Sequence, residues 1–514
     1  MMDKARRLPL FVGWTAWRSL RVETVAQIAL LIPFLVAVPI ALLFGFSLSS
    51  PDSFFNILIM AICFGVMLLP VFIRWHDIML IASWNLPVFV FFLPGQPQLW
   101  MLMVFVSLVI SFVSGGLSQN INPNALRTRT QIMKPVGWSL IALAGVVLTT
   151  AFIRGGIGGR AFGSEIYGAK KYLPILFAVV GFFALSRINI ADDQRRKVIL
   201  LFFGGYLLLT ISNLAYMAGP SFYWLYYIFP FVYALPQVES DINASGFARF
   251  SGIAFAMTGV FCYMLARYGI KNIMRIKHLP RLLVFLIAIG LATFGGYRSL
   301  LVLFAFIFIF QFYLEGLFST HLFPLFAVIG ALLLGVGILF VNKMPYSVQR
   351  TFSFLPITVD PVVREDARAS TEWRFGMWSV LWDEIPKYLV VGKGYRIDPA
   401  ELALFDWARA THRGHFDDYE EVIAVGNYHS GPFSVLLSFG IMGVTAVLWF
   451  WGAGLRMLRS NMTRGNPELR LINITLFSCF AARVVFFLFI YGELSTDLPI
   501  FCGLLGISAI LNKP

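Results

Sequence analysis

Charge and cysteine are both scarce in this chain of 514 residues. Charged residues make up 13% of the sequence, whereas hydrophobic residues make up 59%. Its four cysteines all fall inside apolar runs, at spacings that match no metal site and indicate no disulfide framework. They are Cys63, Cys262, Cys479 and Cys502. A soluble domain of this size needs far less apolar sequence, and we expect neither a metal ion nor a cofactor.

Apolar runs of about 20 residues, the length that a helix needs to cross the hydrocarbon core, recur from end to end. We therefore expect an all-α polytopic membrane protein with about 14 transmembrane helices. The first run follows a basic N-terminus and lacks a small-residue cleavage site, so we expect it to be retained. The predicted spans lie near residues 27–47, 54–73, 78–93, 98–114, 137–153, 172–188, 198–218, 251–267, 282–296, 299–315, 321–341, 431–454, 471–490 and 498–511.

The net charge of +14 would suggest a nucleic-acid partner in a soluble protein. Here the lysines and arginines concentrate in alternate connecting loops, as the positive-inside rule requires, and no nucleic acid is expected. This distribution predicts cytoplasmic termini and one long external loop. The chain then divides into an N-terminal bundle of about 11 helices over residues 1–341, the external loop over 342–429, and about three helices over 430–514.

The long external loop carries two helical patterns. Residues 371–388 place Trp373, Met377, Leu381, Trp382 and Ile385 at helical spacing. Residues 399–410 form a second, shorter amphipathic pattern that begins with a proline. Helices of this kind usually lie on the membrane plane, and we expect both to do so.

A polar stretch joins this loop to the next apolar run. Ser430 is a good N-cap and Pro432 is tolerated in a first helical turn, so a helix is predicted to begin there. His429 then precedes a helix start, where unpaired N–H groups and the helix dipole attract anions. The ordinary alternative is a histidine on an interfacial loop.

Four arginines stand where burial or the membrane interface makes a charge costly. Arg298 follows two glycines in a predicted tight external turn, Arg374 lies within 371–388, and Arg249 ends an aromatic external loop. Arg483 lies inside an apolar span, where an ionised side chain is a functional candidate by default. Each has an ordinary alternative. These are snorkelling at a helix end for Arg298, the polar face of a helix for Arg374, an interface anchor for Arg249, and an ion pair with Glu493 or Asp497 for Arg483.

The expected topology brings Arg298, Arg374 and His429 to one membrane surface. Guanidinium groups bind phosphate oxygens in a fixed fork and keep their charge. A phosphate-bearing lipid presented at that surface would need such residues. The polyprenyl diphosphate carriers of surface-glycan assembly are lipids of this kind.

The same residues resemble a family signature. His429-Ser430, followed after nine residues by Gly440 and after two more by Gly443, is similar to the histidine motif of O-antigen ligases and O-antigen polymerases. Arg298 in its small-residue turn, Arg374 with Trp378 and the Gly392-Lys393-Gly394 run, and the long external loop fit the same superfamily. The resemblance covers roughly residues 240–460.

This resemblance implies a membrane glycosyltransferase of the bacterial inner membrane, with its active site on the periplasmic face. It would transfer a glycan from undecaprenyl diphosphate to a sugar hydroxyl, without metal, in O-antigen, lipopolysaccharide or exopolysaccharide assembly. The acceptor would be a glycan or a lipid A core. Arg298 and Arg374, with Arg249 and Arg483, would bind the donor diphosphate, and His429 would deprotonate or orient the acceptor hydroxyl. The large number of spans leaves ligase and polymerase both open.

Other functions stay possible at this point. A metal-dependent transferase would use an external acidic motif such as Glu239-Ser240-Asp241 or the pair Asp417-Asp418. A transporter or flippase for lipid-linked glycans would suit the number of spans, and Arg483 favours it. Against it, transporters usually place their functional residues near the midplane, whereas the other candidate residues here are expected at one face. A structural membrane subunit is the least specific alternative.

Overall fold

A computed structural model describes residues 54–91, 95–117, 123–158, 168–233, 249–355, 357–398 and 420–513, with a few isolated positions between them. Within these ranges the regular structure is helical, and an isolated β-bridge pairs Phe89 with Gln98. The chain divides into two compact units, Met1–Arg74 and Trp75–Pro514. The candidate site belongs entirely to the second unit.

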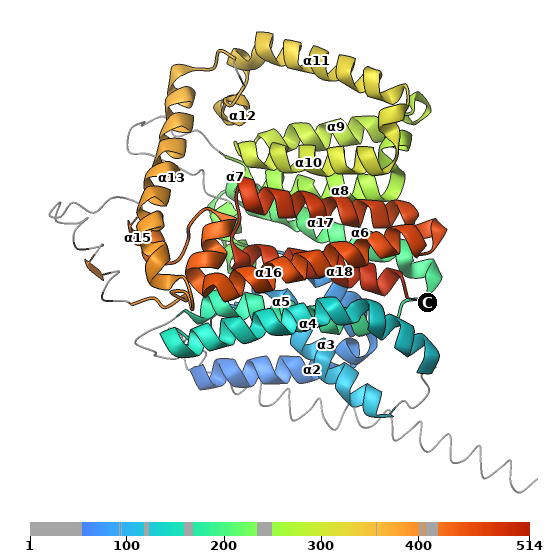
Figure 1. Ribbon diagram of the computed structural model, residues 1–514, viewed down its shortest axis with the longest axis vertical. Helices are drawn as coiled ribbons and strands as arrows, with labels where there is room; N and C mark the ends of the chain where they lie inside the picture. Colours follow the sequence, from blue (N-terminus) through green and yellow to red (C-terminus); the bar gives the residue numbers. More distant parts are fainter. Residues whose placement is uncertain are drawn as a thin grey trace, which may run out of the picture. The chain divides into compact units, whose positions relative to one another are not determined.

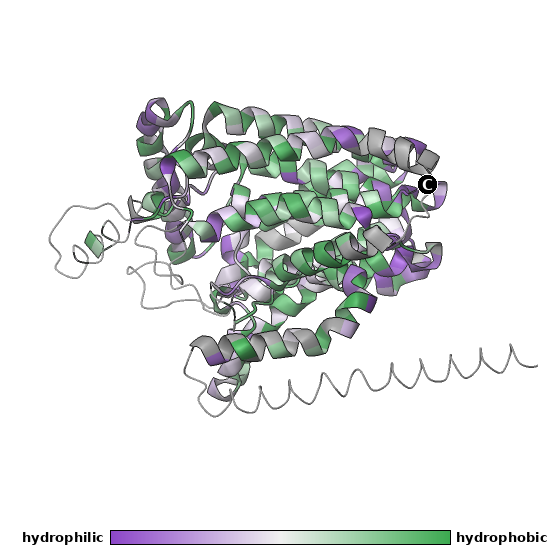
Figure 2. Ribbon diagram, turned by 90° about the horizontal axis from the view of Figure 1, so that it is seen from below, coloured by the Kyte–Doolittle hydropathy of each residue, from purple (hydrophilic) through white to green (hydrophobic). Residues whose placement is uncertain are grey.

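Seven helices in the described part of the chain are long and apolar enough to cross a membrane. In the view coloured by hydropathy, the long helices are largely hydrophobic along their length, and hydrophilic residues gather near the helix ends (Figure 2). The seven are α4 (Pro123–Arg154), α5 (Ala169–Arg187), the composite of α6, η3 and α7 (Arg195–Ala218), α8 (Ser251–Ile273), α16 (Gly431–Arg464), η9 with α17 (Pro467–Phe489) and α18 (Leu494–Leu511).

Four further helices carry shorter apolar stretches. These are α3 (Leu99–Leu117), α9 (Leu279–Thr293), α10 (Arg298–Leu314) and α11 (Leu322–Phe340). All eleven helices coincide with predicted spans. The predicted span near 27–47 lies outside the described residues.

One pair of predicted spans is wrong. Where the sequence predicted two helices near 54–73 and 78–93, the structure has a single helix α2 (Phe54–Ser83), followed by a non-helical segment up to Gln98. Residues 74–77, between the two predicted spans, lie inside the helix, where His76 Nδ1 lies 3.1 Å from Ser107 Oγ and from the carboxylate of Asp77. The helix ends at Ser83, and Pro87 disfavours helical geometry at Leu86, so the helix does not resume there.

Helices α8, α10, α16 and α18 all begin at the same end of this bundle, where α9 and α17 finish. Two tight connections produce this arrangement: residues 294–297 join α9 to α10, and residues 490–493 join α17 to α18. The packing is extensive between α16 and α4, between α5 and α18, and between α17 and both α10 and α8. Polar residues from several helix ends are therefore brought together.

Helix α13 (Pro361–Tyr388) runs across these ends (orange in Figure 1). Asp360 caps it by accepting a hydrogen bond from the Val362 N–H across 2.9 Å, and Pro361 occupies the first turn. The helix is one continuous element that starts ten residues before the predicted 371–388. Short helix α12 (Tyr346–Phe352) packs beside its beginning.

Most of the apolar face predicted over residues 371–388 is covered by other parts of the chain. Met377 and Leu381 are fully buried against Tyr428, Phe433 and Leu437, so the apolar face packs on protein. Of the predicted apolar stripe only Trp382 is largely exposed, at 65%. The second predicted helix, 399–410, lies mostly outside the described residues.

Candidate functional site

A pocket of about 320 Å³ opens beside α13, and four arginines line it. They come from segments far apart in the sequence. Arg249 precedes α8, Arg298 begins α10, Arg350 lies in α12, and Arg374 lies in α13. The other lining residues among those described are Tyr297, Ser299, Val302, Phe354, Ser370 and Ile490. No acidic side chain is among the described residues that line this pocket.

Arg298 owes its place to the turn before it. Gly296 has φ of +67°, a left-handed conformation that glycine adopts without strain, and the chain reverses there from α9 into α10. Arg298 Nη2 then lies 3.3 Å from both the Ala367 carbonyl and Thr371 Oγ1 on α13. Arg350, Arg374 and Asp366 all lie within electrostatic range of Arg298.

Arg350 is the pocket residue that sequence reasoning missed. Its side chain is 5% exposed, and its Nε donates to Asp366 Oδ2 in a very short contact. Its Nη1 donates to the Gly296 carbonyl across 3.2 Å. Arg249, 2% exposed, approaches the same Asp366 oxygen at 3.8 Å. Asp366 therefore holds two arginines in place at the base of the pocket.

Asp366, Ser370 and Arg374 are spaced four residues apart and share one face of α13. On this face Asp366 pairs with two of the pocket arginines, and Ser370 and Arg374 line the pocket themselves. Buried arginines that keep their charge create a site for a multiply charged anion, because each added guanidinium offers forked N–H donors. The arrangement can hold an anion of diphosphate size.

His429 lies next to this pocket, just before α16. Its φ is +47°, an uncommon value for a residue other than glycine, so its neighbours must hold it there. The ring of Trp373 meets the imidazole edge-on at 5.5 Å between centroids, and the ring of Tyr491 lies 5.7 Å away on another side. Trp378 Nε1 donates to the Tyr428 carbonyl across 3.0 Å and fixes the backbone that leads to His429.

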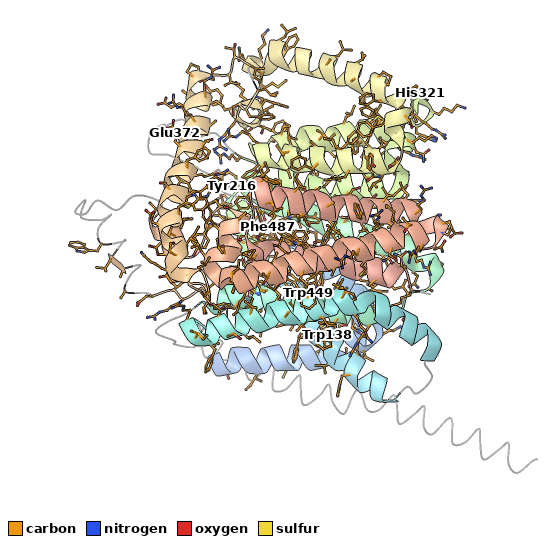
Figure 3. The ribbon with its side chains drawn as sticks, viewed as in Figure 1. Trp138, Tyr216, His321, Glu372, Trp449 and Phe487 are labelled. Carbon is orange, nitrogen blue, oxygen red and sulfur yellow. The ribbon has the colours of Figure 1, made fainter. Side chains whose placement is uncertain are left out.

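Two elements connect the pocket to His429 through adjacent residues. On α13, Trp373 contacts the imidazole and Arg374 lines the pocket. After α17, Ile490 lines the pocket and Tyr491 contacts the imidazole. Figure 3 labels Glu372 on the same part of α13 and Phe487 near the end of α17, which locate these two elements.

Tyr491 lies within electrostatic range of Arg374 in the pocket and contacts the His429 imidazole. Burial, followed by the carboxylates of Glu493 and Asp497, raises the pKa of the Tyr491 phenol, and Arg374 acts in the opposite direction. Arg374 therefore lies close enough to act on a side chain that touches the imidazole. The phenol stays protonated at neutral pH and can offer a hydrogen bond but no negative charge.

The glycines of the two sequence motifs meet in space. At Gly440 the backbone of α16 leaves helical geometry, with φ of +65°, and a Cβ there would lie 2.3 Å from the Val390 carbonyl oxygen. The break frees the carbonyls of Leu437 and Ser438, which accept from the N–H groups of residues 393 and 394 across 2.6 and 3.0 Å. A Cβ at Gly392 would lie 2.4 Å from the Ser438 oxygen. Glycine is thus required at both positions because the two backbones touch.

The predicted start of the helix after His429 is confirmed, with one correction. Ser430 is the N-cap residue and Pro432 lies in the first turn. The Ser430 side chain makes no capping hydrogen bond; its backbone carbonyl accepts from the Ser434 N–H across 2.9 Å instead.

Arg483 lies apart from the pocket. Its Nη1 donates to Asp497 Oδ1 across 2.7 Å, and it lines a separate small cavity between α6, η3, α8, α10, α17 and α18. An ion pair with Glu493 or Asp497 was the ordinary alternative given for this residue, and the structure has the pair with Asp497. Of the five candidate residues, the structure brings Arg249, Arg298, Arg374 and His429 together and leaves Arg483 elsewhere.

The acidic motifs that a metal-dependent enzyme would use, Glu239-Ser240-Asp241 and Asp417-Asp418, fall outside the described residues. Among the residues that the structure describes, no cluster of three or more histidine, cysteine or carboxylate side chains could hold a metal ion.

Comparison with known proteins adds no relative to this geometry. No protein-family model matches the chain, and no curated protein matches it.

Proposed function

We propose that this protein is a membrane glycosyltransferase that uses a polyprenyl diphosphate-linked glycan as its donor. One observation carries the proposal. Arg298 and Arg374, from distant parts of the chain, line a single anion pocket, and Trp373, the neighbour of Arg374, contacts His429. This places cationic groups for a leaving diphosphate beside a titratable imidazole.

The donor is best described as undecaprenyl diphosphate carrying a glycan, held at the periplasmic face of the bacterial inner membrane. As the glycosidic bond to phosphate breaks, negative charge grows on the leaving diphosphate. Preorganised guanidinium groups stabilise that charge in the transition state. Val302, Phe354 and Ile490 form the apolar part of the pocket wall, where the lipid end of the donor would leave.

The acceptor is a sugar hydroxyl, on a growing glycan or on a lipid A core. Neutral imidazole is the form that accepts a proton from the hydroxyl, and the position of His429 ahead of a helix N-terminus favours that form. Trp373 and Tyr491 contact the imidazole on two sides, and aromatic side chains of this kind are surfaces on which sugar rings pack. The proposal covers both ligase and polymerase activity.

The test supplies the purified full-length protein in nanodiscs with a lipid-linked glycan, with and without a lipid A core acceptor. Longer lipid-linked chains would identify a polymerase, and glycan on the core a ligase. His429→Ala, Arg298→Ala and Arg374→Ala should each abolish transfer in folded protein, and a chelator should leave transfer intact. Full transfer by His429→Ala would overturn the assignment of the histidine.

The alternative of a transporter for lipid-linked glycans predicts a different result. The lipid would change leaflet without any change in its glycan. The observation that favoured a transporter, a charged residue within a span, is accounted for by the pairing of Arg483 with Asp497. We therefore keep glycosyl transfer as the proposal.

A further inference from the structure

Lys171 joins two segments that flank His429. It is the third residue of α5, and its Nζ donates to the Gly426 carbonyl across 2.9 Å. The same ammonium lies 2.9 Å from Glu493 Oε1. Gly426 precedes His429 by three residues, and Glu493 follows Tyr491, whose ring contacts the imidazole, by two. One side chain thus ties the backbone on one side of the histidine to the turn on the other.

The acidic partner is itself held in place. Glu493 Oε1 accepts from Ser495 Oγ across 2.9 Å, and the Glu493 N–H donates to Asp497 Oδ2 across 2.9 Å. The side chains of Lys171 and Glu493 are 20% and 12% exposed. An ion pair so shielded from water is fixed far better than a surface pair, and removal of one partner leaves a largely buried charge.

The environment of Lys171 favours a structural contact over contact with a donor. Besides the Gly426 carbonyl and Glu493, the ammonium contacts the ring of Tyr395 in a cation–π interaction, with Nζ 5.4 Å from the ring centroid. Lys171 is not among the described residues that line the arginine pocket. The ammonium is therefore fully engaged by the protein around His429.

We propose that Lys171 and Glu493 are positioning residues that hold the imidazole of His429 in its working place. They act through the Gly426 backbone and through the turn that carries Tyr491. The His429 backbone has an uncommon left-handed conformation, so a released loop would relax away from it. The kinetic part of the inference rests on the proposed glycosyl transfer.

The kinetic experiment compares Lys171→Met, Glu493→Gln and the double variant in full-length protein with the lipid-linked glycan donor. Misplacement of a reacting group costs rate, so each single change should lower kcat about 10- to 100-fold and leave KM for the donor within about threefold. The double variant should be no worse than either single one, and Lys171→Arg should restore most of the rate. Lys170→Met, an exposed neighbour on α5, is the matched control. Additive losses, or an unaltered kcat in both single variants, would overturn the proposal.

A second experiment is independent of transfer. Diethyl pyrocarbonate modifies accessible imidazoles, and peptide mass spectrometry gives its rate at His429 alone. Release of the loop should raise this rate in Lys171→Met and Glu493→Gln and leave it unchanged in Lys170→Met. Equal rates in all variants would refute the positioning role. If the wild-type protein transfers no glycan, the proposed function fails, whereas this labelling still decides the role of the pair. Should Lys171→Met not fold, Glu493→Gln, which keeps the shape of its side chain, decides the result.

Discussion

The indole N–H of Trp378 donates a 3.0 Å hydrogen bond to the carbonyl of Tyr428, the residue before His429. Through this bond α13, which carries Arg374 one turn earlier, also fixes the histidine. The first prediction follows from the removal of this donor. Trp378→Phe keeps an aromatic ring and leaves a buried carbonyl unpaired, which costs about 1–3 kcal/mol. We expect a lower Tm and a larger fall in kcat than rise in KM. Trp382→Phe, on the exposed side of the same helix, should resemble wild type; equal effects of the two changes would contradict the prediction.

The shared carboxylate of Asp366 leads to a prediction about stability. Asp366→Asn removes the charge that compensates Arg350 and Arg249, both almost fully buried. Loss of one partner from a buried ion pair costs about 3–5 kcal/mol, so Tm in detergent should fall by many degrees. Glu372→Gln, which breaks an exposed pair with Arg368 on the same helix, should leave Tm unchanged. Similar melting of the two variants would show that Asp366 does not brace the pocket.

The arginine pocket should bind inorganic pyrophosphate in the absence of any glycan. A ligand that binds only the folded protein stabilises it, by about 2.7 kcal/mol at a concentration 100-fold above Kd. Pyrophosphate should therefore raise Tm of the wild type, and Arg298→Ala or Arg374→Ala should remove that rise. Arg368→Ala, on α13 but outside the lining residues, is the control and should retain it. A rise that persists in Arg298→Ala would place the anion elsewhere.

The break in α16 gives a prediction that needs no ligand. Gly440→Ala would place a Cβ 2.3 Å from the Val390 oxygen, at a φ of +65° and a ψ of −165° that essentially only glycine adopts and that cost other residues about 1–3 kcal/mol. We expect marked loss of folded protein and of transfer. Gly452→Ala, in the same helix, meets nothing within 4 Å and should be neutral or slightly stabilising. Size-exclusion profiles and Tm of the two variants provide the comparison.

Arg483 is expected to act through stability alone. Arg483→Met leaves Asp497 buried without its partner and should lower Tm. The double variant Arg483→Met with Asp497→Asn removes both charges and keeps an oxygen to accept from the Glu493 N–H, so it should recover most of the stability and of the transfer. Recovered Tm without recovered transfer would instead give Arg483 a direct role with the donor.

The membrane-spanning elements were predictable because apolar length alone defines them. Helix α17, for example, occupies Arg470–Phe489 against a predicted 471–490. The prediction failed at residues 74–77, since a polar segment within a helix can be satisfied by partners such as Ser107 that lie on another helix. Local sequence contains no record of such partners.

The site was predictable in part for a similar reason. Arg298, Arg374 and His429 carry local signals: a glycine turn, a helical pattern and a helix start. Arg350 carries none, because its importance comes from Asp366, 16 residues away, and from the Gly296 carbonyl, 54 residues away. The polar run from Gln349 to Thr351 around it, which the fold buries, does not single out the arginine. Arg483 was a candidate because it is a charged residue within an apolar span, but its ion pair with Asp497 is visible only in the structure.

The discontinuity at Gly440 also has a mechanical meaning. It divides α16 into a short rod next to His429 and a long rod within the bundle, and the short rod is bonded to residues 393–394 beyond α13. A straight 34-residue helix would tie the direction of the segment that follows His429 to the helix axis within the bundle, whereas the break gives the two segments separate directions. The direction of the short segment at the polar end can therefore differ from that of the long apolar segment, which keeps its packing in the bundle.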